Sequence, residues 1–349
     1  MGVVESVKGI MWARKRQPGE VVYGVSLAHE RFSPRDLLAQ AVEAEQAGFD
    51  VVSCSDHLAP WWDPASGPPA HCGNAWVWLG AVGNATSRVS LGPAVSAIVH
   101  RYNPVVMAQQ IATLELLNPG RAFLAVGSGE AMNEVPAGLR WPPPAEQLAR
   151  TEEALTIITR LLDGLTVDFG GRYFRAEGAR LYDVPPRRPA VYLSAFGPQA
   201  AAIAGRLADG VWTLADPQKA PRVIAAYRRS CEEAGREPGE IILQGLAAAA
   251  KDDGAALAGS REWKGTLAGE SYREDVHDPA EVGGLGEEVS DRKFKMMGIV
   301  SADPGDHIRK IKAIRAMGAT AIIIMNVSGA DPHGTLRLYG REILPALRA

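Results

Sequence analysis

The chain has 349 residues, of which 46% are hydrophobic and 22% charged, and its formal net charge at pH 7 is -3. This length and hydrophobic fraction suit two average domains or one large α/β barrel with a full core. The small net charge and the lack of a continuous apolar run of about 18 residues predict no nucleic-acid partner and no membrane span. Three scattered cysteines, Cys54, Cys72 and Cys231, form neither a disulfide framework nor a zinc knuckle, so we expect a cytoplasmic protein without a metal.

The first twenty residues precede any regular pattern. Their basic triplet, Arg14-Lys15-Arg16, is not followed by the apolar run of a secretory signal. We therefore expect residues 1–20 to be a surface extension and residues 21–349 to form a single domain.

From Val21 onward, strand-like and helix-like segments alternate. Ser33-Pro34 is typical of a helix start and Gly48 of a helix end, and Asn103-Pro104 opens another helix. Strands are expected at 21–27, 49–53, 89–97, 121–127, 190–195, 209–214, 241–246 and 321–325, and further helices at 144–162, from 198, from 220, from 304 and up to about 347. A hairpin at 166–175 and an insertion of loops and short helices at about 251–298 interrupt this order.

Eight strands, each followed by a helix, predict a (β/α)8 TIM barrel with insertions. A doubly wound open sheet is the alternative, because the periodicity of the elements does not distinguish a closed sheet from an open one. No Gly-x-Gly-x-x-Gly opens the first helix, which argues against a Rossmann dinucleotide site.

In a TIM barrel the loops that follow the strands gather at one rim. That rim would receive Glu30, the Asp56-His57 pair, the Ser128-Gly129-Glu130 segment and Gly197-Pro198. A histidine there titrates near neutral pH and can act as an acid or a base. The structural alternative is that Asp56 caps the next helix and His57 merely packs.

Several motifs together resemble one enzyme family. They are Ser55-Asp56-His57 with Pro60-Trp61, Arg101-Tyr102-Asn103-Pro104, the segment from Gly127 to Glu134, Tyr182-Asp183-Val184-Pro185 and Gly197-Pro198. With them the chain resembles the luciferase-like flavin and deazaflavin oxidoreductases, and within these the coenzyme F420-dependent glucose-6-phosphate dehydrogenase group. The resemblance runs from about Tyr23 to the C-terminus and implies a TIM barrel with insertions and a homodimer.

The resemblance also implies roles for individual residues. His57 would be the base that takes the substrate hydroxyl proton, Trp61 would flank the reacting carbon, and Glu130 would manage the proton of the reduced deazaflavin. The positions that correspond to cofactor contacts are Asp56, Ala94, Val95, Ser128, Gly129, Asn133, Gly197 and Pro198, with a cis peptide bond between Ala94 and Val95. Glu30, Lys219 and Arg273 correspond to positions near the substrate.

The chain departs from these relatives where they bind the phosphate of their substrate. Leu214 and Pro217 stand at positions that correspond to a Thr and a Lys, and Met297 replaces one of the later basic residues. An Asp216-Pro217 pair is poor chemistry for a phosphate dianion, so glucose 6-phosphate is not the expected substrate. We expect F420-dependent hydride transfer to or from an alcohol, sugar or sugar phosphate; an FMN-dependent monooxygenase and a non-enzymatic ligand-binding barrel are the alternatives.

Overall fold

The structure is a computed structural model that describes residues 12–13, 19–273 and 276–349, without the side chain of Arg273. Ten of the described strands form one sheet, and every strand pair in it is parallel. Its strands are β1 (Val22–Leu27), β2 (Val51–Cys54), β3 (Ser90–Pro93), β4 (Ser96–Ala97), β5 (Phe123–Gly127), β8 (Ala190–Ser194), β9 (Gly210–Leu214), β10 (Glu240–Ala248), β11 (Ile299–Val300) and β12 (Ala321–Asn326).

The sheet curls until its two ends almost meet. The strand order is β3-β2-β1-β12-β10-β9-β8-β5-β4, with β11 beside β10. A parallel bridge between Leu91 and Ala122, with Leu91 N donating to Arg121 O at 2.9 Å, joins β3 to the start of β5. The predicted (β/α)8 barrel is confirmed, and the open-sheet alternative is wrong because β3 and β5 are bridged. The expected strand at 89–97 is divided into β3 and β4 at the Ala94–Val95 peptide bond, which is cis as predicted.

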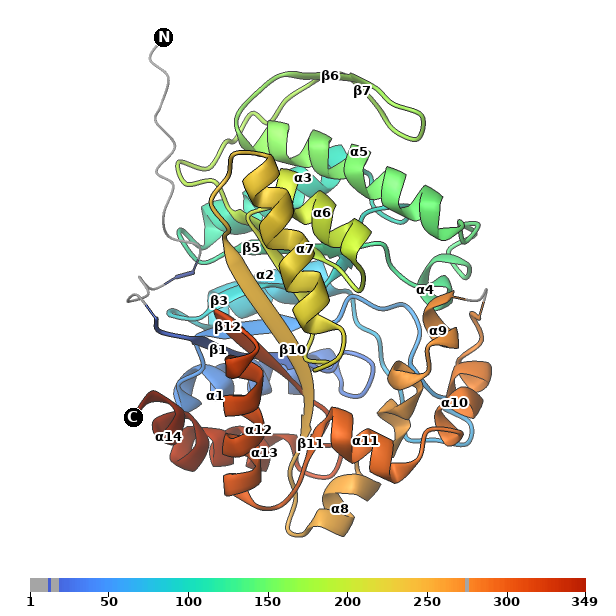
Figure 1. Cartoon of the computed structure of the whole chain (residues 1–349), viewed down its shortest axis with the longest axis vertical. Helices are drawn as coiled ribbons and strands as arrows, with labels where there is room; N and C mark the ends of the chain where they lie inside the picture. The colour runs from blue at the N-terminus through green and yellow to red at the C-terminus, as the bar shows by residue number, and fades with distance from the viewer. Residues whose placement is uncertain (1–11, 14–18, 274–275) are drawn as a thin grey trace.

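Helices surround the barrel (Figure 1). Ser33 Oγ accepts from Asp36 N at the start of α1, and Gly48, with φ 91°, ends this helix. The helices that alternate with barrel strands are α1 (Pro34–Ala47), α2 (Ala75–Ala85), α3 (Pro104–Leu117), α4 (Ala131–Glu134), α5 (Pro144–Leu162), α6 (Pro198–Leu207), α7 (Ala220–Glu233), α12 (Pro304–Ala316), α13 (Pro332–Leu338), the π-helix Tyr339–Ile343 and α14 (Leu344–Arg348). Within the described ranges, none of the helices combines the length and apolar character that crossing a bilayer requires.

Two additions extend this frame. The predicted hairpin consists of β6 (Val167–Gly170) and β7 (Arg175–Ala179), which lie beyond α5 at the top of Figure 1. Residues 251–298 contain α8 (Asp253–Ala258), the 3-10 helix Arg261–Leu267, α9 (Glu270–Arg273), α10 (Pro279–Glu287) and α11 (Asp291–Met297). Trp263, Val282 and Phe294 of this segment are buried in one apolar cluster with Trp61 and Trp62, so the insertion packs on the loop that follows β2.

Trp12 lies inside the barrel, at the N-terminal ends of its strands. It is 2% exposed and belongs to an apolar cluster with the strand-opening residues Val22 and Phe123. Its ring centroid is 5.5 Å from that of Phe123 and 5.3 Å from that of Tyr192. The expectation of a surface extension is therefore wrong for Trp12, since the interior of the barrel offers an aromatic ring more buried area than the surface does. Most of the predicted extension, residues 1–11 and 14–18, lies outside the described part of the chain.

Candidate active site

The C-terminal ends of the barrel strands bring one histidine between two carboxylates. His57 follows β2, Glu30 follows β1 and Glu130 follows β5. His57 Nδ1 lies 3.5 Å from Glu30 Oε1, and its Nε2 lies 3.8 Å from Glu130 Oε2. The side chains of His57 and Glu130 are 10% and 22% exposed, whereas that of Glu30 is fully buried. The imidazole therefore has a buried acid on one side and a more accessible acid on the other.

Two side chains hold the buried carboxylate of Glu30 in place. Ser55 Oγ donates to Glu30 Oε2 at 2.5 Å, and Trp61 Nε1 donates to Glu30 Oε1 at 3.3 Å. His57 Nδ1 is buried and has no hydrogen-bond partner among the described residues. Its nearest acid is Glu30, at a separation just beyond a hydrogen bond, and such contacts commonly tighten when substrate binds. Glu30 can thus orient His57 with Nε2 directed away from it.

Asn133 connects Glu130 to the loop that carries His57. Its Nδ2 donates to Glu130 Oε2 at 3.1 Å, and its Oδ1 accepts from the backbone nitrogens of Leu58 and Ala59 at 2.8 and 3.3 Å. Both the amide nitrogen and the amide oxygen of Asn133 are thus bonded to protein. In this structure Asn133 positions Glu130 rather than presenting a free amide.

Asp56 ties the β2 loop to the segment after β4. Its carboxylate accepts from Ser96 Oγ at 2.5 Å and Tyr102 OH at 3.1 Å, and it pairs with Arg101 Nη1 at 3.4 Å. The next helix, α2, is capped by Asn74, so the structural alternative for Asp56 as a helix cap is wrong. Burial and the neighbouring carboxylate of Asp56 raise the pKa of the Tyr102 hydroxyl, which therefore stays protonated and serves as a donor.

Arg101 and Glu134 are site residues to which the sequence analysis assigns no role, although both lie within its motifs. Arg101 Nη2 donates to Asp56 O at 2.7 Å, and Arg101 N donates to Glu134 Oε2 at 3.0 Å. Arg101 Nε lies 3.4 Å from Glu134 Oε1. Burial raises the pKa of Glu134 to about 7, even though Arg101 opposes the shift. Arg101 thus links the β2 loop to α4, the two elements that carry His57 and Asn133.

Glycines occur at the end of β5, in the loop that follows it and directly before α6. Gly129 has a φ of +84°, and a Cβ there would lie 2.7 Å from Ala97 Cβ. A Cβ on Gly127 would lie 2.9 Å from Val95 Cγ2. Gly197 caps α6 without any side-chain hydrogen bond, and a Cβ there would meet nothing within 4 Å. Gly127 and Gly129 therefore allow close packing against Val95 and Ala97, and the open N-terminus of α6 suits an anion such as a phosphate.

Three aromatic side chains extend outward from His57. The ring centroids of His57 and Trp61 lie 5.2 Å apart, those of Trp61 and Tyr272 5.7 Å, and those of Tyr272 and Phe196 5.6 Å. We call Trp61, Tyr272 and Phe196 the aromatic wall. Tyr272 belongs to α9 of the insertion, and nothing in its local sequence singles it out as a site residue.

The structure does not connect two predicted residues with this cluster. Lys219 precedes α7, is 73% exposed, and has its ion pair, at 4.0 Å, with Asp216. Arg273 is the last residue of α9, and its side chain lies outside the described part. Where the chain is described, no group of three or more His, Cys, Asp and Glu side chains could hold a metal ion, and His71 contacts Glu30 through its backbone nitrogen.

A barrel with ionisable side chains gathered at the C-terminal ends of its strands is the arrangement of TIM-barrel enzymes. A family model described as luciferase-like monooxygenase matches residues 7–321, and the chain belongs to that family. The chain is 38% identical over 339 residues to the F420-dependent glucose-6-phosphate dehydrogenase of Nakamurella multipartita, covering 95% of this chain and 98% of the relative.

Two further relatives carry other names. The chain is 35% identical over 333 residues to the F420-dependent hydroxymycolic acid dehydrogenase of Mycobacterium tuberculosis, covering 95% of this chain and 90% of the relative. The solved structure of an F420-dependent secondary alcohol dehydrogenase in complex with an F420-acetone adduct matches with a TM-score of 0.90 and 31% identity. That match covers 95% of this chain and all (100%) of the other. The predicted family is confirmed by these comparisons.

Proposed function

We propose that this chain is a coenzyme F420-dependent oxidoreductase that acts on the CH–OH group of an alcohol, sugar or sugar phosphate. The observation that carries the proposal is His57 between Glu30 and Glu130 at the mouth of the barrel. An acid–base residue between an orienting carboxylate and an accessible one suits the removal of a hydroxyl proton. The names of the relatives support F420 as the cofactor.

The chain's own residues fit such a cofactor. Ala94, Val95, Ser128 and Gly129 would lie against the ring, and Gly197 with Pro198 at the open start of α6 would receive a phosphate. Asp56 and Asn133, whose side chains are engaged with protein, would act by holding the loops around it. When bound, the deazaflavin would supply a hydride acceptor at its C5.

In this proposal the protein moves two protons. His57 Nε2 takes the proton of the substrate hydroxyl, and Glu30 keeps the imidazole oriented through Nδ1. Glu130 would hold and release a second proton beside the bound cofactor, since its carboxylate is more exposed than that of Glu30. Trp61 flanks the reacting carbon with its ring while its indole nitrogen is held by Glu30.

Cofactor choice tests the proposal. The purified chain should quench the fluorescence of oxidised F420 on titration and should release no FMN when denatured. A matched titration with FMN serves as the control. FMN that copurifies with the chain, together with no response to F420, would favour the luciferase-like monooxygenase alternative instead.

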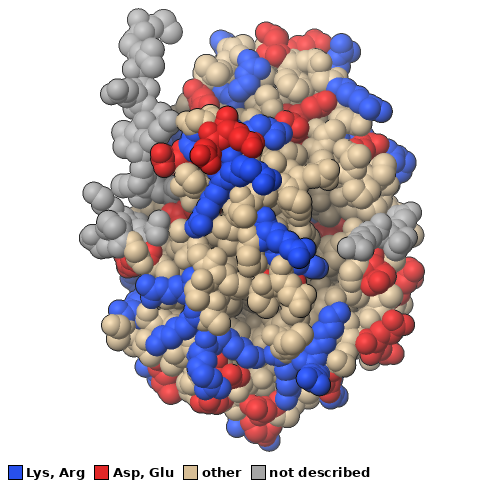
Figure 2. Space-filling view, in the orientation of Figure 1, with Lys and Arg blue, Asp and Glu red and all other residues tan. Residues whose placement is uncertain are grey.

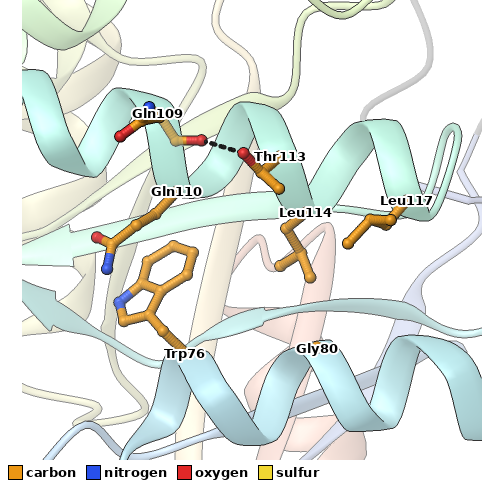
Figure 3. A pocket seen from close by; sticks show the side chains of 7 residues that line it. All are labelled: Trp76, Gly80, Gln109, Gln110, Thr113, Leu114 and Leu117. Atoms are coloured by element: carbon orange, nitrogen blue, oxygen red, sulfur yellow. Dashed lines mark hydrogen bonds between the residues drawn. The ribbon is translucent and has the colours of Figure 1, made fainter. Parts of the chain in front are cut away.

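We also propose a homodimer formed through α2 and α3. Figure 3 shows Trp76 and Gly80 of α2 facing residues of α3 across a surface pocket. Neither helix has an exposed charge: α2 contains no Asp, Glu, Lys or Arg, and Glu115 of α3 is 3% exposed. Val77 and Leu117 are 78% and 69% exposed. An uncharged apolar face of this kind is typical of a protein–protein interface.

We place the enzyme in the cytoplasm, without a nucleic-acid or membrane partner. Cys54, Cys72 and Cys231 are free thiols, and two of them are buried, which suits a reducing compartment. On the face shown in Figure 2, acidic and basic side chains are interspersed, and this arrangement supports a small-molecule substrate rather than a polyanion.

A further inference from the structure

The aromatic wall presents carbon rather than polar atoms to the mouth of the barrel. The hydroxyl of Tyr272 donates to Thr266 O at 3.1 Å, and the indole nitrogen of Trp61 donates to Glu30. Phe196 has no polar atom, and it is 49% exposed at the outer end of the wall. The rings therefore form a continuous row of apolar contacts from His57, through the buried Trp61, to the exposed Phe196.

Tyr272 lies close to the acid pair as well as to the rings. Glu130 and Glu30 both contribute to the raised pKa of the Tyr272 hydroxyl, after burial, which is the largest cause. Trp61 and Tyr272 therefore lie close to the acids that flank His57. A group attached to the reacting carbon would meet the faces of Trp61 and Tyr272 before it reached solvent.

Several of the basic side chains described on the surrounding loops and insertion are paired with carboxylates, whereas Lys293 Nζ donates to Leu267 O at 3.5 Å. Arg31 Nε lies 3.2 Å from Glu262 Oε1, and Lys264 Nζ lies 2.7 Å from Asp291 Oδ1. Lys219 points to Asp216 and is mostly exposed. Arg101 is held by Asp56 and Glu134. A phosphate dianion that recruited one of these paired groups would have to break its ion pair, whereas an uncharged substrate would leave the pairs intact.

We propose that the substrate is an uncharged secondary alcohol, or its ketone, that carries an apolar ring-sized group, and that Tyr272 and Phe196 are its specificity-determining residues. The inference rests on the proposed F420-dependent function and narrows its substrate. In the oxidation, the C–H bond of the carbinol breaks with its electron pair going to C5 of the deazaflavin. The O–H proton passes to His57, a C=O double bond forms, and the two-electron oxidant is F420.

Binding without turnover tests the substrate class. Saturation-transfer NMR should show cyclohexanone bound to the chain, both with and without F420, and should show no transfer to glucose 6-phosphate. Phe196→Ala and Tyr272→Ala should each weaken cyclohexanone binding about tenfold or more, because each removes an apolar ring face. Tyr272→Phe should bind like the wild type, since the lost hydroxyl faces Thr266. Tyr182→Ala, at a tyrosine that is 83% exposed, is the matched control and should change nothing.

The same samples separate failure of the inference from failure of the proposed function. The inference would be overturned if glucose 6-phosphate bound as tightly as cyclohexanone. It would also be overturned if cyclohexanone did not bind. In steady state, cyclohexanol should reduce F420 with a higher kcat/KM than glucose 6-phosphate, and Phe196→Ala should act mainly through KM. If F420 neither binds nor is reduced by any alcohol or sugar, the proposed function fails, while the NMR result still decides whether the wall takes apolar ketones.

Discussion

At the scale of single residues, the two carboxylates of the site lie in different surroundings. Glu30 is buried and receives donors from Ser55 and Trp61, whereas Glu130 is partly exposed and its carboxylate accepts a hydrogen bond from Asn133. A buried acid with its lone pairs engaged is suited to orienting a base, and an exposed one is suited to exchanging protons. His57 lies between them, so its removal should affect proton transfer more than cofactor binding.

His57→Ala should lower turnover by roughly a hundredfold to ten-thousandfold while F420 affinity stays within a few fold, because a positioned base contributes about that much to rate. Steady-state kinetics and fluorescence titration measure the two quantities. His71→Ala changes an exposed histidine on the following loop and serves as the control. Unchanged turnover in His57→Ala would remove His57 as the base.

Glu134 should make stability depend on pH. Its pKa of about 7 in the folded protein exceeds that of an ordinary glutamate, so its contribution is fully present below about pH 4.5 and is lost as the pH rises through 7. Glu134→Gln should flatten this part of the profile, by about 3 kcal/mol at most. Urea unfolding of both proteins between pH 5 and pH 8 measures the difference. If the wild type became more stable relative to Glu134→Gln as the pH rose from 5 to 8, the raised pKa of Glu134 would be contradicted.

At the scale of elements, the barrel strands hold the site and the segments outside the repeat complete it. The β2 and β5 loops carry His57 and Glu130, and β4 carries Ser96, which donates to Asp56. The insertion supplies Tyr272, and the N-terminal segment supplies Trp12 at the opposite end of the barrel. Trp12 contributes a buried ring to the barrel interior, whereas Tyr272 is a partly buried ring beside Trp61.

Trp12→Ala should lower the free energy of unfolding by about 3–5 kcal/mol, the range for removing a large aromatic side chain from a core. The physical reason is the cavity left between Phe123 and Tyr192. Trp12→Phe should recover most of the loss, because a ring still fills the space. Guanidinium unfolding of the three proteins tests this, and a loss below about 1 kcal/mol for Trp12→Ala would show that the segment does not anchor the barrel.

At the scale of the whole molecule, closure of the sheet forms the mouth of the barrel, and an uncharged outer face offers a surface for association. The Leu91–Ala122 bridge brings β3 next to β5, and this closure gathers the strand ends at one mouth. The α2–α3 face lies outside the barrel and exposes apolar side chains to solvent. Association of two copies through this face would remove that surface from water.

Leu117→Glu together with Val77→Glu should convert the proposed dimer to a monomer, because two carboxylates per copy would be buried without partners. Sedimentation velocity measures the assembly, and circular dichroism checks that the fold persists. Leu165→Glu places the same charge at a leucine that is 48% exposed elsewhere, and it should leave the dimer intact. Equal sedimentation of the wild type and the α2–α3 double variant would exclude this face as the interface.

Local patterns in the sequence were enough to predict the alternating elements, the barrel and the family. Strand periodicity, the Ser33-Pro34 and Asn103-Pro104 helix starts and the Gly48 helix end depend on neighbouring residues only, so a single chain displays them. The positions of His57 and Glu130 after strands also follow from local order, because every strand of a parallel barrel ends at the same rim.

Only the tertiary structure decided which side chains meet. The Glu30–His57–Glu130 distances, the engagement of Asp56 and Asn133 with protein, and the tilted ring contact of Tyr272 with Trp61 join residues from separate loops. The burial of Trp12 was likewise invisible in a segment without periodicity. Such contacts depend on how loops and insertions pack across the barrel mouth and floor, and no short-range pattern records that packing. The sequence therefore determined the scaffold and the proposed reacting groups, whereas the packed structure determined the aromatic wall that we propose limits the substrate.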